Sequence, residues 1–312
     1  MLRLKVFITA IFLCSAFALN AAESPFQFVR YNSSARAAGL AGCFTSMPND
    51  ISALFFNPAV LPTIRDKHFS TTFMKHVLDI NSGNIAYSKS YMDYGWFAAS
   101  LGYTNYGSFT RADDLGQTSN TFSANDMILQ VSYANELDSN LYYGVTAKFL
   151  YANIEKYYST AVALDAGILY IFPDRRTNVG LSILHAGTQV TKYNNTKEEL
   201  PLDIRFGINN RLKGLPLLVN FSLSHLADPT NNFFDRFLNF SIAGELYLGD
   251  YVQARIGYDN QVRREVALDA DKKMTGISGG IGLKLKDFNF DYGIAIAGTS
   301  ALMHRFSLAL DF

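Results

Sequence analysis

The sequence predicts an all-β protein, an antiparallel transmembrane β-barrel of about 14 strands with a short N-terminal plug segment. Apolar and polar residues alternate with a period of two from about residue 67 onward, as in a strand with one apolar and one polar face. The alternating segments run for about 10 to 15 residues, against the roughly 5 to 6 usual in globular sheets. An export signal at the start of the chain adds a third observation.

Composition excludes several classes of protein. The 312 residues carry 27 Lys and Arg against 27 Asp and Glu, so the formal net charge is zero. That balance argues against an electrostatic nucleic-acid binder. Charged residues make up 17% of the chain and aromatic residues 14%, a composition too apolar for a disordered protein.

The first element, residues 1–22, has the pattern of a secretory signal peptide. Arg3 and Lys5 give a charged start, residues 6–19 are apolar, and Ala22 closes a small-residue cleavage site. The apolar run is shorter than the roughly 20 residues that a membrane-spanning helix needs. Beyond it we find no comparable apolar run, so the mature chain is expected to cross a membrane only with strands.

The second element, residues 23–66, does not alternate. It contains two short helix-like stretches, 34–40 and 50–56, the second capped by Asp50 and ended by Pro58. Small residues in the first stretch suit tight packing. The segment is expected to be either a plug inside the barrel or a periplasmic lead-in to it.

The third element, residues 67–312, is the barrel. In its last segment Phe306, Leu308 and Leu310 point to one side, and Arg305 and Ser307 point to the other. The same alternation predicts strands near 67–77, 82–91, 95–106, 122–136, 141–154, 157–171, 178–188, 201–212, 216–227, 237–249, 251–261, 275–286, 287–298 and 303–312.

The connections between these strands favour an outer-membrane barrel. Short joints tend to alternate with longer polar connections at 107–121, 189–200, 229–236 and 262–274, the asymmetry of short periplasmic turns and long extracellular loops. A soluble β-sandwich also alternates, with its apolar face turned inward. Strand length, aromatic residues near strand ends and the export signal favour the membrane barrel.

In a barrel of this kind the polar face lines the lumen. It would carry charges of both signs that pair across the barrel, which favours a filled interior over an ion-selective pore. The predicted lumen charges are Lys148, Asp165, Arg205, Glu245, Arg255, Asp259, Asp291 and Arg305, with Asp203 and Lys284 on the same face.

We predict no catalytic site, no metal site and no cofactor. Residues 276–280 read G-x-S-x-G, but the nucleophile elbow needs a following helix and here another strand follows. The five histidines do not occur at metal-ligand spacings, and Cys43 is the single cysteine of the mature chain.

The densest charge cluster lies in the 262–274 loop. It is either a solvated loop or a docking surface for a partner outside the cell. The candidate docking residues are Arg263, Arg264, Asp269, Asp271, Lys272 and Lys273.

A family resemblance enters through the N-terminal segment. Residues 36–42, with Arg36, Ala38, Gly39 and Gly42, are followed by Asp50 and then by Asn57-Pro58-Ala59 and Leu61. In this order and spacing they resemble the N-terminal signature of the PorV/PorQ outer-membrane family. Later segments, at 122–126, 155–161, 199–203, 225–226, 256–260 and 291–293, resemble its PorQ branch.

The resemblance implies a FadL-like barrel of the type IX secretion system, surrounded by outer-membrane lipid. It implies an anchor for a PorZ-like surface protein and, through it, for PorU- and PorV-like components of the cargo attachment complex. A FadL-like transporter of hydrophobic compounds remains the alternative. An outer-membrane enzyme is the least favoured interpretation, because no acid–base or nucleophile constellation is visible.

Overall fold

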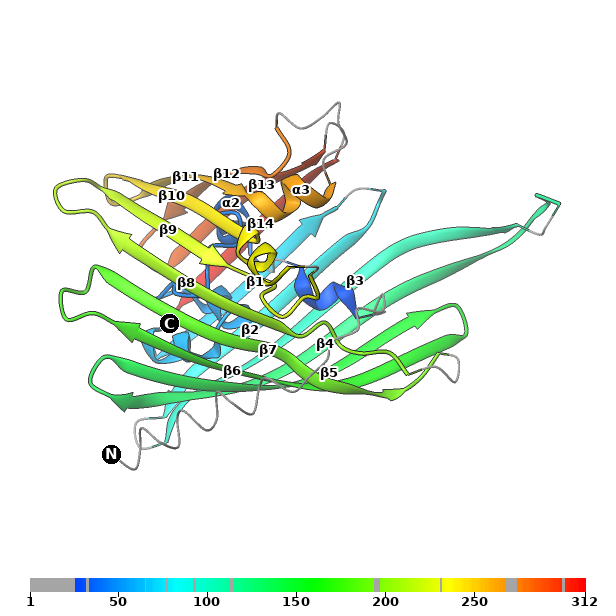
Figure 1. The fold of residues 1–312 in the computed structure, drawn as a ribbon, viewed down its shortest axis with the longest axis horizontal. Helices are drawn as coiled ribbons and strands as arrows, with labels where there is room; N and C mark the ends of the chain where they lie inside the picture. The colour runs from blue at the N-terminus through cyan, green and yellow to red at the C-terminus, as the bar shows by residue number, and fades with distance from the viewer. Residues whose placement is uncertain are drawn as a thin grey trace.

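The computed structural model describes residues 26–31, 34–64, 66–76, 78–91, 94–112, 115–193, 197–230, 232–266, 274–298 and 301–312. Fourteen antiparallel strands form one closed barrel in which each strand pairs with its sequence neighbours and β1 pairs with β14 (Figure 1). The predicted fold class is confirmed. The strands are β1 (Lys67–Lys75), β2 (Asn81–Tyr91), β3 (Gly95–Ala112), β4 (Thr118–Asp138), β5 (Leu141–Ile154), β6 (Tyr157–Ile171), β7 (Thr177–Thr191), β8 (Asp203–Arg211), β9 (Leu217–Leu223), β10 (Phe240–Leu248), β11 (Val252–Asp259), β12 (Ile277–Lys284), β13 (Phe288–Gly298) and β14 (Ala301–Asp311).

Alternation along each strand sorts its side chains between the two faces of the wall. On β6, Val162 and Leu164 are exposed on the outer face, and Asp165 is buried on the inner face. Small polar residues such as Ser132 and Thr146 are buried inside, where their hydroxyl groups hydrogen-bond to each other at 2.8 Å. An apolar outer band around a polar interior is the arrangement that lipid requires of a barrel.

The two ends of the barrel differ in the length of their connections. Short turns join strands at the end where β14 finishes, and left-handed residues such as Asn140, Gly214 and Gly249 make several of them possible. The longer connections gather at the opposite end. Because outer-membrane barrels keep short turns in the periplasm, we name these the periplasmic and extracellular ends.

The hairpin of β3 and β4 is longer than predicted and projects beyond the other strands at the extracellular end (Figure 1). Residues 107–121 were expected to form a loop. Instead the ladder continues through the pairs Ser108–Ser123 and Phe109–Phe122, whose rings stack. Beyond the barrel rim neither face of the hairpin touches lipid, so the alternation that marks the other strands is absent there.

The described residues include six short helical segments beside the strands, and none of these has the length and hydropathy to cross a membrane. The helix capped by Asp50 ends at Phe55, before Pro58 as expected, and Pro58 itself begins η4, where a proline ring fits because the N–H that it lacks has no helical acceptor there. The helices are η2 (Gln27–Arg30), α2 (Ala35–Gly39), η3 (Ile51–Phe55), η4 (Pro58–Thr63), η5 (Phe233–Leu238) and α3 (Asn260–Val266). The expected signal peptide, residues 1–22, lies outside the described residues.

Two extracellular connections contain helices that the alternation did not reveal. Strand β9 ends at Leu223 and β10 begins at Phe240, so the predicted strands 216–227 and 237–249 are both too long. Helix η5 lies between them, and α3 begins the 262–274 region that was expected to be a loop. Each helix has at most seven residues, too few to display a helical period in the sequence.

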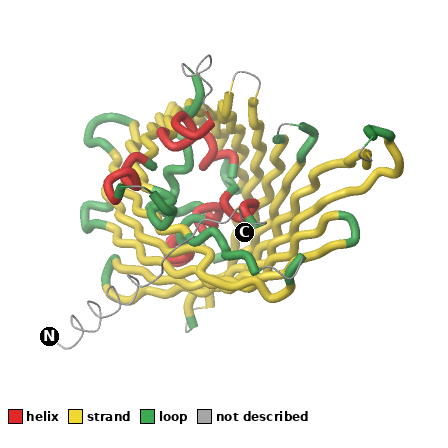
Figure 2. Tube along the Cα trace, turned by 45° about the vertical axis from the view of Figure 1, so that its right-hand side comes forward, coloured by secondary structure: helices red, strands yellow, loops and turns green. Residues whose placement is uncertain are grey.

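Residues 34–64, which we call the plug, lie inside the ring of strands (Figure 2). Their apolar side chains form the largest buried cluster of the molecule, in which Phe44, Met47 and Phe56 pack against the wall residues Leu169 and Leu218. Burial of aromatic and aliphatic side chains on this scale makes the plug an integral part of the core.

Candidate functional site

Three polar residues of the plug begin its three helices. The Ser34 hydroxyl accepts a hydrogen bond from the backbone N–H of Ala37, the Asp50 carboxylate from Ser52, and the Asn57 amide oxygen from Ala59. Side chains of this kind satisfy backbone donors that have no partner within a helix.

Asn57 also ties the plug to the wall. Its amide nitrogen donates to the backbone oxygens of Thr45 and Ile168, both at 2.9 Å, and so joins two parts of the plug to strand β6. Asn57 is fully buried. Its replacement would leave buried backbone groups without partners.

Glycines on the inner wall allow the plug backbone to approach it closely. A Cβ atom added at Gly144 would lie 2.5 Å from the carbonyl of Pro58, and one at Gly257 would lie 2.7 Å from the nitrogen of Ala41. Real Cβ atoms essentially never come within 3.0 Å of such atoms. Inward glycines on seven strands would each place an added Cβ within 3.3 Å of a plug atom, and we call them the glycine belt: Gly144, Gly167, Gly180, Gly207, Gly257, Gly280 and Gly293.

The small residues of the predicted N-terminal signature take part in the same contact. Ala38 is buried, and Gly39 lies against Gly280 of strand β12, where a Cβ on Gly39 would come within 3.1 Å of the facing Cα. Gly42 has a left-handed backbone (φ 75°) and its N–H donates to the carbonyl of Ala37, which ends the helix.

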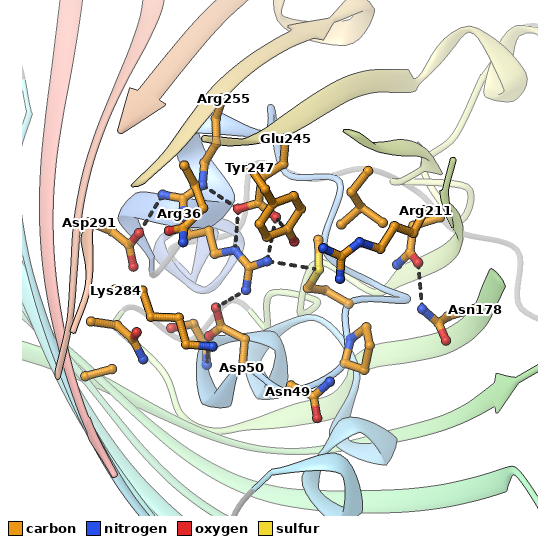
Figure 3. A pocket seen from close by; sticks show the side chains of 18 of the residues that line it. Arg36, Asn49, Asp50, Asn178, Arg211, Glu245, Tyr247, Arg255, Lys284 and Asp291 are labelled. Carbon is orange, nitrogen blue, oxygen red and sulfur yellow. Dashed lines mark hydrogen bonds and ion pairs between the residues drawn. The ribbon is translucent and has the colours of Figure 1, made fainter. Parts of the chain in front are cut away.

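Arg36 connects the plug to the wall through charge. Its guanidinium makes two hydrogen bonds to the Glu245 carboxylate, at 2.9 and 2.6 Å, and one to Asp50 at 2.9 Å (Figure 3). Burial alone would lower the pKa of the Arg36 guanidinium, but Glu245 and Asp50 outweigh it, so the pKa stands well above its ordinary value. Arg255 extends this network from β11 to Glu245 and Asp291, at 2.7 and 2.5 Å.

The network borders a polar cavity of about 300 Å³ at the periplasmic end, between the plug and the wall. We call this cavity the chamber. Figure 3 shows Arg211 and Lys284 reaching into it from opposite sides of the Arg36 network. The ring of Tyr247 lies under the Arg211 guanidinium at 4.6 Å, and its hydroxyl donates to Glu245.

A second charged cluster is buried in the wall on the other side of the lumen. The Lys148 ammonium lies 2.6 Å from the Asp165 carboxylate, and the guanidinium of Arg205 lies 2.7 Å from Asp203. Each acid also accepts a hydrogen bond from the backbone N–H of a histidine. For Asp165 this histidine is His185. Buried pairs satisfied in this way are costly to break.

The predicted lumen charges therefore face inward, but they do not pair across the barrel. Their ion pairs lie within one strand, as for Arg205 and Asp203, or join nearby strands, or join strand to plug, because the plug stands between opposite walls. Asp259 accepts the backbone N–H of Val262 and so begins α3. Arg305 is buried and makes no ion pair with any residue that the structure describes.

At the extracellular end, α3 carries two of the candidate docking residues. The Arg263 guanidinium lies over the ring of Tyr258 at 6.0 Å, and Arg264 lies 3.5 Å from the side chain of Asn239. Asp269, Asp271, Lys272 and Lys273 lie outside the described residues.

An exposed aromatic cluster on η5 was missed in the sequence. Phe233, Phe234 and Phe237 contact one another, and 78% of Phe234 is exposed. Leu238 beside them hydrogen-bonds through its carbonyl to Asn260 of α3. Two phenylalanines, Phe233 and Phe234, within the connection 229–236 that was expected to be polar were the available signal. We call η5 and α3 together the rim patch.

Groups suited to metal or thiol chemistry are few. The described part of the chain holds no cluster of three or more His, Cys, Asp or Glu able to bind a metal ion. Cys43 is buried in the plug, and burial raises the pKa of its thiol well above the usual range.

Comparison with known proteins gives both a family and a fold. The profile of the family described as type IX secretion system protein PorV matches residues 18–184. No curated protein matches the chain.

Solved structures that resemble the chain are barrels of similar size. A deletion mutant of the monoaromatic hydrocarbon channel TodX has a TM-score of 0.62 at 11% identity and covers 89% of this chain and 99% of its own. The Ralstonia pickettii toluene transporter TbuX has a TM-score of 0.54 at 15% identity, covering 91% and 98%. A Pseudomonas aeruginosa FadL homologue has a TM-score of 0.51 at 12% identity, covering 89% and 97%. At these identities the likeness shows a FadL-like fold.

Proposed function

Because the chain belongs to the family of type IX secretion system protein PorV, and is thus an outer-membrane barrel of that system, we propose that it anchors a surface protein of the cargo attachment complex. The partner proposed is PorZ-like, with PorU- and PorV-like components reached through it. The barrel then supports secretion and surface attachment without catalysis.

The fixed plug is the observation that supports an anchor best. The glycine belt brings the plug backbone against seven strands, and Arg36 binds Glu245 in the wall. Passage of a solute through the lumen would require the plug to move, and movement would break these contacts together. A permanently filled barrel serves better as a support than as a channel.

The rim patch is the surface that we assign to the partner. It combines exposed rings, including Phe233 and Phe234, with the cationic side chains of Arg263 and Arg264. Exposed aromatic residues beside arginine are the composition of protein-binding surfaces.

Transport of hydrophobic compounds is the second candidate. The observation in its favour is the fold, because neighbours of the same architecture are described as a monoaromatic hydrocarbon channel and a toluene transporter. A transporter of this type would need an apolar pocket large enough for a ligand and a plug that can move.

Gentle detergent extraction of the tagged protein from outer membranes, with bound proteins identified by mass spectrometry, tests the anchor. We expect a large surface protein to co-purify, and Phe234→Ser to reduce its recovery. Leu115→Ser is the matched control, because Leu115 is 83% exposed at the tip of the β3–β4 hairpin, away from the rim patch. Recovery of the barrel alone, carrying hydrocarbon or fatty acid, would contradict the anchor and support the transporter.

A further inference from the structure

The chamber at the periplasmic end has an excess of positive charge. Six arginine and lysine side chains line it, against three aspartate and glutamate side chains. The Arg36 and Arg255 pairs use all three acids. Four cations remain at the mouth: Arg175, Arg176, Arg211 and Lys284.

These four cations have no acidic partner within the described parts of the chain. Arg176 and Arg211 are held side by side, since the backbone N–H of Arg211 donates to the carbonyl of Arg176 at 2.9 Å. Nη1 of Arg176 is buried and finds no acceptor among the described residues. Like charges in this position repel each other, so their proximity lowers stability until an anion joins them.

The Arg211 guanidinium is positioned to bind a ligand in the chamber. The Tyr247 ring supports the Arg211 guanidinium on one face, which leaves its N–H edges directed into the chamber (Figure 3). A planar guanidinium binds a carboxylate through two parallel hydrogen bonds. The chemistry at the mouth is therefore that of a carboxylate receptor.

We propose that the mouth of the chamber binds the carboxylates of an acidic segment of a periplasmic protein. The cations span the wall from the β6–β7 turn, with Arg175 and Arg176, to Lys284 on β12. Strands lie about 4.8 Å apart, so the span from β7 to β12 is roughly 24 Å along the wall. A single small anion cannot bridge that distance, whereas an extended peptide with several acidic residues can.

A lipid headgroup fits the site less well. The chamber is lined by the plug, by the inner face of the wall and by the β6–β7 turn, whereas lipid contacts the outer face of the wall. The site is also at the opposite end from the rim patch, so this inference does not depend on the proposed surface partner.

Fluorescence anisotropy tests the inference with the full chain in neutral detergent. The probes are a labelled peptide of six glutamates and a labelled peptide of six glutamines. We compare wild type with Arg176→Gln/Arg211→Gln, and with the control Lys75→Gln/Lys156→Gln, which removes the same charge from the extracellular end outside both the chamber and the rim patch. Both pairs lie at the ends of the barrel, and heat-modifiable electrophoresis checks that each variant is folded.

We expect the glutamate peptide to bind wild type and the control alike, and to bind the chamber variant at least tenfold more weakly. Binding should weaken as salt is raised. Equal loss in both variants, equal binding of the glutamine peptide, or capture of vesicles containing anionic phospholipid in place of the peptide would each overturn the proposal.

Discussion

Replacement of Gly144 by alanine tests whether the glycine belt holds the plug. The new Cβ would lie 2.5 Å from the carbonyl of Pro58, so the plug must retreat by about 0.9 Å to reach ordinary contact at 3.4 Å. A shift of that size takes the 2.9 Å bond from Asn57 to the wall residue Ile168 out of hydrogen-bond range.

Two effects then add. Overpacking of a rigid core costs about 1 to 3 kcal/mol, and each lost hydrogen bond costs roughly 1 kcal/mol. With one such bond lost, we expect the free energy of unfolding to fall by about 2 to 4 kcal/mol. The loss is expected even though alanine is otherwise a mild substitution.

Urea unfolding in detergent measures the change in the free energy of unfolding, with Trp96, the single tryptophan, as the fluorescent probe. Gly244→Ala is the matched control, because Gly244 faces outward on β10 and its added Cβ would meet Leu217 at an ordinary 3.5 Å. Equal midpoints for the two variants would refute the idea that the belt fixes the plug.

Three further predictions concern single residues. Arg36→Gln should lower the free energy of unfolding by about 3 to 5 kcal/mol, because it leaves buried carboxylates uncompensated; urea midpoints measure this. Arg305→Met should raise it by at least about 1 kcal/mol, because it removes a buried cation without a described ion-pair partner; a lower midpoint would contradict this. Cys43 should resist maleimide labelling in the folded protein and react after denaturation, since burial and a raised thiol pKa both protect it; mass spectrometry gives the answer.

The period of two was enough to predict the barrel, because lipid outside and polar groups inside impose opposite demands on successive residues. The same reasoning placed Glu245 and Arg255 on polar faces, whereas Arg36 was noted only through the family resemblance. It did not give their partners, since pairing depends on strand register and on the path of the plug.

Other features could not be predicted from the alternation in the sequence. Gly280 was considered only as part of a G-x-S-x-G pattern, whereas in the structure it contacts Gly39, more than two hundred residues earlier in the chain. Contacts between distant backbone segments have no local pattern. Helix η5 and the outer part of the β3–β4 hairpin escaped for a different reason: neither is sorted between lipid and lumen, so neither alternates.

The tight fit of the plug has a consequence for how the protein is assembled. The plug precedes β1 in the chain, yet α2 contacts β13 and β14, which are made last. A finished barrel with this little clearance leaves no room for the plug to thread in afterwards. The pairing of β1 with β14, which closes the barrel, must therefore form around a plug that is already in place. Folding of the plug thus has to precede closure of the barrel during insertion into the outer membrane.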